Sequence, residues 1–198
     1  PFGNRSELAS TYFYGTSSLL APGLSDYAFR VGRVRKDVGF GDVRYDDGTA
    51  LQAWYRRGVG PSLTVGGRVE GDADLRSAGV DVAFKLPLGE VGASVGASDD
   101  HDAGRGNAGS LTYTYAGPRF GFGFGARWFD EAYRRLGDAD DTLLFGGRVR
   151  EDDFASVSLA PFERLSLQLN YARQRREDWP RERSTGLAAT WRLSGRAQ

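Results

Sequence analysis

The chain has 198 residues, and its 26 basic side chains balance its 26 acidic ones. A neutral chain offers no bulk charge to nucleic acid or anionic lipid, and the lack of cysteine excludes disulfides, a thiolate nucleophile and cysteine-ligated metal. No run of about 18 apolar residues occurs, which excludes a transmembrane helix. The chain begins at Pro1 and carries no signal peptide, so we expect a processed product or an excised piece.

Apolar side chains alternate with polar or small ones, with a period of two residues, through most of the sequence. In residues 27–33, for example, Tyr27, Phe29 and Val31 fall on one face of an extended chain. Glycine-rich and aromatic-rich alternation without helical periodicity predicts an all-β, antiparallel fold of about ten to twelve strands. The ten clear strands are residues 27–33, 50–58, 62–71, 77–86, 91–98, 110–116, 119–129, 155–160, 164–173 and 184–194. A further strand is expected at residues 12–19.

The predicted connections alternate between short and long. Tight turns are expected near residues 58–61, 86–89, 116–118 and 160–163. Long, charged connections are expected at residues 34–49, 99–107, from 130 onward and 174–183. Residues 142–150 also alternate, but we assign them to the third long connection. Short turns at one end and long loops at the other are typical of outer-membrane β-barrels, although residues 71–75 form a short exception.

The two faces of the predicted strands differ in chemistry. A soluble β-sandwich also alternates, but strands of about 9–11 residues and aromatic-rich apolar faces favour a transmembrane barrel. The expected lipid-facing or interfacial aromatics are Tyr27, Tyr55, Tyr113, Tyr115, Phe120, Phe122, Phe124, Trp128, Tyr171 and Trp191. The expected lumen-facing charges are Arg30, Arg56, Arg68, Glu70, Asp81, Lys85, Arg127 and Arg192.

Several segments, in order, resemble outer-membrane fimbrial ushers of the chaperone–usher pathway. YFYGTSSLLAPGLSDYAFRVGRVR resembles the usher segment that resumes the barrel after the plug domain. The segments YRRGVGPSLTVGGRVEG, VDVAFKLPLGEVGASVGAS, GSLTYTYAG, ARWFDEAYRRLGDA and FERLSLQLNYARQR resemble later usher strands and hairpins. The resemblance extends from about Tyr12 to Leu193. Trp128 and Phe129 depart from it, since ushers usually have Tyr-Ser there.

The resemblance implies a section of a large single-chain barrel in the bacterial outer membrane. Ushers bind periplasmic chaperone–subunit complexes and export the growing pilus. Residues 1–198 would form one barrel section, without the plug, the N-terminal periplasmic domain or the C-terminal domains of an usher. Its partners would be outer-membrane lipid, the remaining barrel strands or another copy, and, through the full-length usher, pilus subunits and their chaperone.

Two alternatives stay open. A small self-closing outer-membrane barrel, acting as a passive pore or adhesin, requires the first and last strands to pair. Gln198 lacks the aromatic character of the usual barrel-assembly signal, which argues against this alternative. A soluble β-sandwich binding module predicts solubility without detergent.

No residue pattern predicts catalysis, a cofactor or a metal site. His101 is the only histidine, so neither a metal site nor a Ser-His-Asp triad is expected around it. Asp138, Asp140 and Asp141 lack the glycine and closing glutamate of an EF-hand loop. The basic runs at residues 173–176 and 181–183, beside Trp179-Pro180, are interpreted as a charged external loop, with lipopolysaccharide binding as the alternative.

Overall fold

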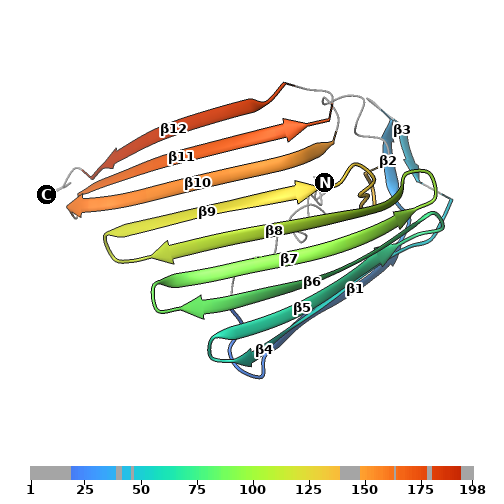
Figure 1. Ribbon diagram of the computed structural model, residues 1–198, viewed down its shortest axis with the longest axis horizontal. Helices are drawn as coiled ribbons and strands as arrows, with labels where there is room; N and C mark the ends of the chain where they lie inside the picture. Colours follow the sequence, from blue (N-terminus) through green and yellow to red (C-terminus); the bar gives the residue numbers. More distant parts are fainter. Residues whose placement is uncertain are drawn as a thin grey trace, which may run out of the picture.

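The computed structural model describes residues 19–38, 42–45, 47–138, 148–162, 164–177 and 180–192. These residues form an all-β structure in which ten strands make one antiparallel sheet and two short strands make a separate hairpin (Figure 1). The sheet contains β1 (Ser25–Gly32), β4 (Ala50–Gly60), β5 (Leu63–Gly71), β6 (Leu75–Leu86), β7 (Gly89–Asp100), β8 (Gly104–Ala116), β9 (Phe120–Phe129), β10 (Val149–Phe162), β11 (Leu165–Arg176) and β12 (Glu182–Trp191). The hairpin pairs β2 (Arg35–Val38) with β3 (Asp42–Tyr45).

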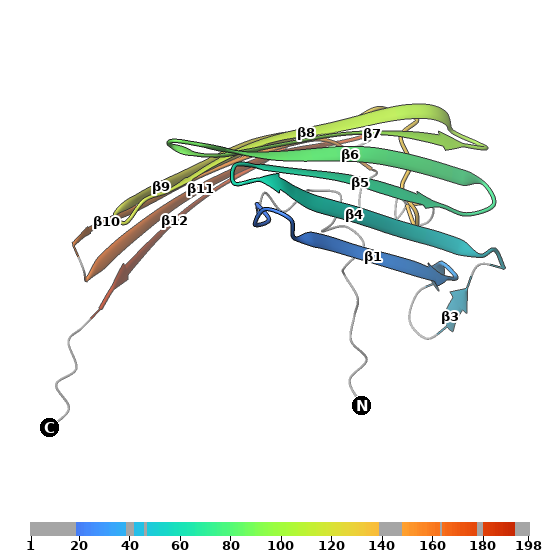
Figure 2. The same cartoon turned by 90° about the horizontal axis from the view of Figure 1, so that it is seen from below.

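Each strand of the sheet pairs with its neighbour in sequence, apart from the β2–β3 insertion between β1 and β4. The sheet bends into an arch, with β1 along one edge and β12 along the other (Figure 2). Within the described residues these two edge strands do not pair, so the sheet is open. A small self-closing barrel requires that pairing, and a β-sandwich requires a second packed sheet; the described part of the chain shows neither.

The cross-strand register places the predicted apolar sets on one face. Tyr113 lies opposite Phe124, and Leu111 lies opposite Ala126, so these side chains point to the same side of the sheet. Alternate positions on β9 are glycines, and Gly123 and Gly125 therefore lie on the other side with Arg127. Residues 130–138 pack against this second, polar face, which is the inside of the arch in Figure 2. We call the two sides the convex apolar face and the concave polar face.

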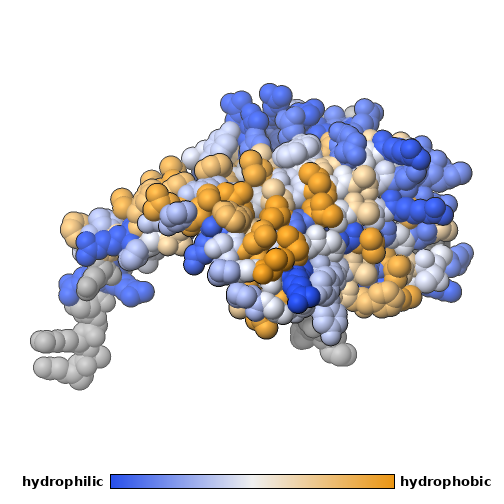
Figure 3. Space-filling model, turned by 60° about the horizontal axis from the view of Figure 1, so that its bottom comes forward, coloured by the Kyte–Doolittle hydropathy of each residue, from blue (hydrophilic) through white to orange (hydrophobic). Residues whose placement is uncertain are grey.

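Burial in this sheet is inverted relative to that of a soluble protein. Large apolar side chains on the convex apolar face are exposed, and they gather into patches over the sheet while hydrophilic residues collect at its ends (Figure 3). The buried polar side chains belong to the concave polar face or its neighbourhood and are Gln52, Arg56, Thr64, Glu70, Ser77, Ser98 and Ser110. The buried apolar residues are Ala50, Leu75, Ala83, Ala108 and Tyr133. The polar side chains of the concave polar face are therefore buried, and the apolar side chains of the convex apolar face are exposed.

The ten strands predicted from alternation are all present in the sheet, but several connections differ from expectation. The long loop predicted at residues 99–107 is wrong, because β7 runs to Asp100, β8 begins at Gly104, and only residues 101–103 turn. The connection predicted at residues 34–49 contains the β2–β3 hairpin. The strand expected at residues 12–19 and most of residues 142–150 lie outside the described residues. No helix in the described residues has the length and apolarity needed to cross a bilayer.

Candidate functional site: the concave polar face

The charges predicted to face a lumen share the concave polar face where the strand register defines their side. Arg30 lies opposite Gln52 and Lys85 lies opposite Glu90, while Arg192 follows the last residue of β12. The other members of this face are Arg56, Arg68, Glu70, Asp81 and Arg127. The structure therefore brings most of the predicted set to one side of the sheet.

Several of these charges form ion pairs, within one strand or between strands. Arg56 Nε lies 3.1 Å from Asp81 Oδ2, and Arg68 Nη2 lies 2.7 Å from Glu70 Oε1. Arg127 forms an ion pair with Asp152, a residue of β10 that the sequence analysis did not single out. Because these arginines have carboxylates beside them, the face presents charges of both signs.

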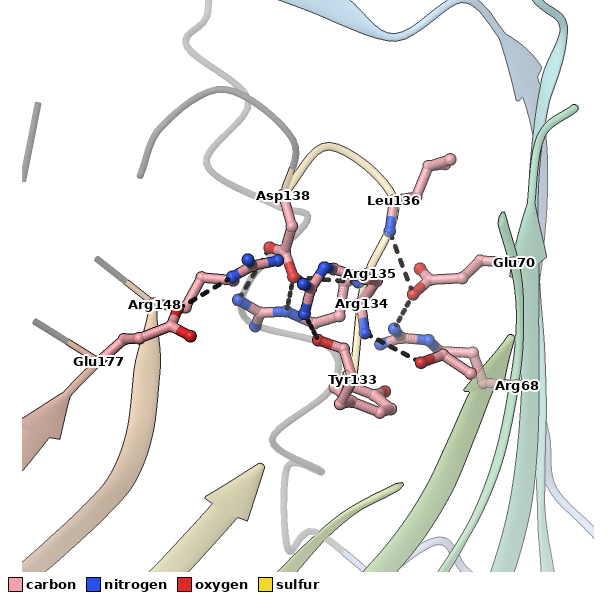
Figure 4. Close-up of polar contacts among 10 residues, drawn as sticks. Arg68, Glu70, Tyr133, Arg134, Arg135, Leu136, Asp138, Arg148 and Glu177 are labelled. Carbon is pink, nitrogen blue, oxygen red and sulfur yellow. Dashed lines mark hydrogen bonds and ion pairs between the residues drawn. The ribbon is translucent and has the colours of Figure 1, made fainter. Parts of the chain in front are cut away.

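The connection between β9 and β10 folds inward over this face. We call residues 130–138 the inner segment. The amide of Arg134 donates to Ser98 Oγ at 2.9 Å. The amide of Leu136 lies 3.5 Å from Glu70 Oε1 (Figure 4). At the start of the segment, the amide of Asn107 donates to Asp130 Oδ2 at 3.0 Å. The segment is thus attached to β5, β7 and β8.

Tyr133 is the apolar anchor of the inner segment. It is only 3% exposed, it packs with Ala108, and its ring centroid lies 5.9 Å from that of Phe129. A Cβ atom at position 106 would lie 2.0 Å from the Tyr133 nitrogen, so Gly106 is required for this close approach. Burial raises the pKa of the Tyr133 hydroxyl from 10.0 to about 12, against smaller lowering effects of Ser77 and Arg68.

Arginines surround the remainder of the inner segment. Arg135 forms an ion pair with Asp138 at 3.1 Å, and its guanidinium lies 5.6 Å from the Phe129 ring centroid. Burial lowers the pKa of Arg134, with a further lowering by the positive charge of Arg148. Arg148 is itself 3.7 Å from Glu177 (Figure 4). The inner segment carries two arginines and three carboxylates, so it adds both signs of charge to the concave polar face near the ends of β10 and β11.

The predicted interfacial aromatics lie on the convex apolar face. Tyr27 and Tyr55 are directly opposite one another, as are Leu165 and Trp191. Ring contacts join the centre of the set, with Tyr113 stacked on Phe124 at 5.5 Å. The other aromatics that the register places on this face are Tyr115, Phe120, Phe122, Trp128 and Tyr171.

The remaining sequence candidates do not form a site in the described residues. His101 lies in the exposed turn between β7 and β8. In this turn, Asp100 Oδ1 accepts hydrogen bonds from the backbone amides of Asp102 and Ala103. Asp138 is bound to Arg135, and Asp140 and Asp141 lie outside the described residues, as does Trp179. Among the residues that are described, no group of three or more acidic or histidine side chains forms a metal-binding cluster.

The inner segment is the feature that sequence reasoning missed. Its residues were assigned to an external connection because they are polar and lack alternation. Glycines at alternate positions of β8, including Gly106, were the one available signal for a chain packed closely against that strand.

The geometry also agrees with a known structure. The chain matches the crystal structure of the usher PapC translocation pore with a TM-score of 0.62 and 18% sequence identity. The fold is usher-like. The match covers 86% of this chain and 37% of that chain, so the chain spans about a third of the pore protein. No protein-family model matches the sequence, and no curated protein matches it.

Proposed function

We propose that this chain is a section of the wall of an outer-membrane usher pore. The observation that carries the proposal is the inverted sheet, in which apolar side chains are exposed and charged ones are covered. In a bilayer, exposed Phe124 and Val80 would contact lipid, while Arg56 and Glu70 would face a water-filled lumen. The similarity of the fold to a translocation pore supports the same arrangement.

The proposed role is the export and assembly of pilus subunits that a periplasmic chaperone delivers. The wall section would act by housing the passage and would need no catalysis and no cofactor. The open edges at β1 and β12 would pair with further strands of the barrel, because lipid leaves no partner for exposed backbone groups.

Fractionation and intact mass test the location and the size of the protein. We expect the native polypeptide in detergent extracts of outer membranes, with a mass several times the 21.6 kDa of this chain. Recovery in the soluble fraction would contradict the membrane role. A heat-modifiable outer-membrane protein of 21.6 kDa would instead support the small closed barrel.

Deletion of the gene tests the role in assembly. Cells without the protein should lose surface fibres and accumulate chaperone–subunit complexes in the periplasm, and re-expression should reverse both effects. Normal fibres in the deletion strain would contradict the assembly role, but they would not bear on the usher-like fold.

A further inference from the structure

The convex apolar face ends abruptly on β10, β11 and β12. Leu169 lies opposite Leu187 near the middle of these strands, and both are well exposed, at 46% and 77%. Further along the same face, the side chains are Asp153, Arg173 and Arg183. In a membrane-spanning sheet, the position just beyond the apolar band lies at the level of the lipid headgroups.

The charges at this boundary are unbalanced. Arg173 Nε donates to Asp153 Oδ2 at 2.8 Å, and Arg175 Nη2 donates to Glu151 Oε1 at 2.7 Å. Arg183 lies directly opposite Arg173, and within the described residues it makes no ion pair. Like charges in such cross-strand positions destabilise a sheet unless an anion lies between them. A guanidinium has five N–H donors, so Arg173 and Arg175 also keep donors beyond those used by their carboxylate partners.

The corresponding boundary on β6–β8 is arranged differently. Arg76 and Arg105 each lie directly opposite Asp99, and Arg105 is bound to it at 3.1 Å. The facing pair of arginines on β11 and β12 therefore has no counterpart on β6–β8. A like-charged pair beside exposed leucines fits a ligand with both a negative headgroup and acyl chains.

We propose that Arg173 and Arg183 bind a phosphate group of lipid A in the outer leaflet, with its acyl chains along Leu169 and Leu187. This inference rests on the proposed membrane location, which places the loop-bearing end of the sheet outside. Asp153 holds the Arg173 guanidinium through its hydrogen bond, and Glu151 holds the neighbouring Arg175 in the same way. Arginine suits the site because its planar fork donates two hydrogen bonds to a phosphate.

The test uses the native protein purified in mild detergent from outer membranes and stripped of lipid. Native mass spectrometry would measure the binding of bis-phosphorylated lipid A and of chemically dephosphorylated lipid A. Arg183→Gln should weaken binding of the phosphorylated form about fivefold, as removal of one surface arginine predicts. Arg192→Gln, just beyond the opposite end of β12, is the matched control and should bind normally. Arg183→Lys should restore most of the affinity.

The dephosphorylated lipid should bind wild-type protein at least as weakly as the phosphorylated lipid binds Arg183→Gln, because it loses the contacts of both arginines. Equal binding by wild type and Arg183→Gln, or an equal loss in Arg192→Gln, would overturn the inference. Resistance to SDS at room temperature would verify that each variant is folded. A protein that is absent from outer membranes would refute the proposed function itself, whereas normal lipid binding by Arg183→Gln from outer membranes would refute only this inference.

Discussion

The amide nitrogen of Arg134 lies 2.9 Å from Ser98 Oγ, although 36 positions separate the two residues in the chain. This contact, with that of Leu136 to Glu70, holds the inner segment on the concave polar face. In a closed barrel the segment would occupy part of the lumen. Under the proposed function, the stability of the segment would then affect the passage as well as the wall.

Gly106→Ala should release the inner segment. The new Cβ atom would lie 2.0 Å from the backbone nitrogen of Tyr133, which no side-chain rotation can relieve. We expect docking to weaken by about 1–3 kcal/mol, as for overpacking of a tight contact. Hydrogen exchange of residues 130–138, read by mass spectrometry, should accelerate. Gly67→Ala is the control, because its Cβ would meet only Gly79 O at 3.7 Å, and unchanged exchange in both variants would refute the contact.

High pH should also release the segment. Below pH 10 Tyr133 is neutral whether docked or free, so its titration leaves docking unchanged. Burial raises the pKa of Tyr133 from 10.0 in the released segment to about 12 in the docked one. As the pH rises, the tyrosine of the released segment therefore ionises first. This ionisation favours the released state progressively between pH 10 and about pH 12. The difference in absorbance at 295 nm between wild type and Tyr133→Phe reports this titration. A midpoint near pH 10 for that difference would show that Tyr133 is not buried.

Loss of an ordered inner segment should widen the pore. Replacing residues 131–137 with a Gly-Ser linker of equal length removes the contacts of Tyr133, Arg134 and Leu136 with the wall. Single-channel conductance in planar bilayers should rise. The same replacement of the turn at residues 101–103, at the same end of the sheet, serves as the control and should leave conductance unchanged. Equal conductance in all three proteins would place the segment outside the passage.

A charge should be tolerated on one face of β11 and costly on the other. Leu169 is on the convex apolar face, and the adjacent Gln168 is an exposed residue of the concave polar face. Leu169→Arg should reduce the free energy of unfolding in lipid vesicles by about 2–4 kcal/mol, the cost of a charge near a bilayer midplane. Gln168→Arg should have little effect. Urea titration of both variants measures the difference, and equal destabilisation would argue against a lipid-facing convex side.

The strands were predictable because alternation records which face each residue occupies. In residues 120–125 of β9 phenylalanine and glycine alternate, and Ala126, Arg127 and Trp128 keep the same two faces, so both the strand and its faces follow from the sequence. The error at residues 99–107 has a physical cause. Asp99, Arg105 and Asn107 belong to strand ends beyond the apolar band, where both faces are polar and alternation vanishes.

The inner segment was not predictable, because its contacts are long-range. The amides of Arg134 and Leu136 bind side chains of β7 and β5, and no local periodicity encodes such pairs. Similarly, the ion pairs of Asp153 with Arg173 and of Glu151 with Arg175 depend on strand register. The predicted strand ended at Arg173 and left Arg175 in a loop, whereas β11 continues to Arg176 and both arginines belong to the β10–β11 ladder.

The most direct measurement compares the two faces at adjacent positions of β7. The chain has no cysteine, so Ser94→Cys and Val95→Cys each introduce a single reporter. Val95 is 58% exposed on the convex apolar face, and Ser94 lies on the concave polar face beside Ser110. In outer membranes, a fluorophore at position 95 should be quenched by nitroxide-labelled lipid, and a water-soluble thiol reagent should react at position 94. The opposite pattern, or equal access to water at both positions, would contradict the assignment of this sheet to a membrane pore wall.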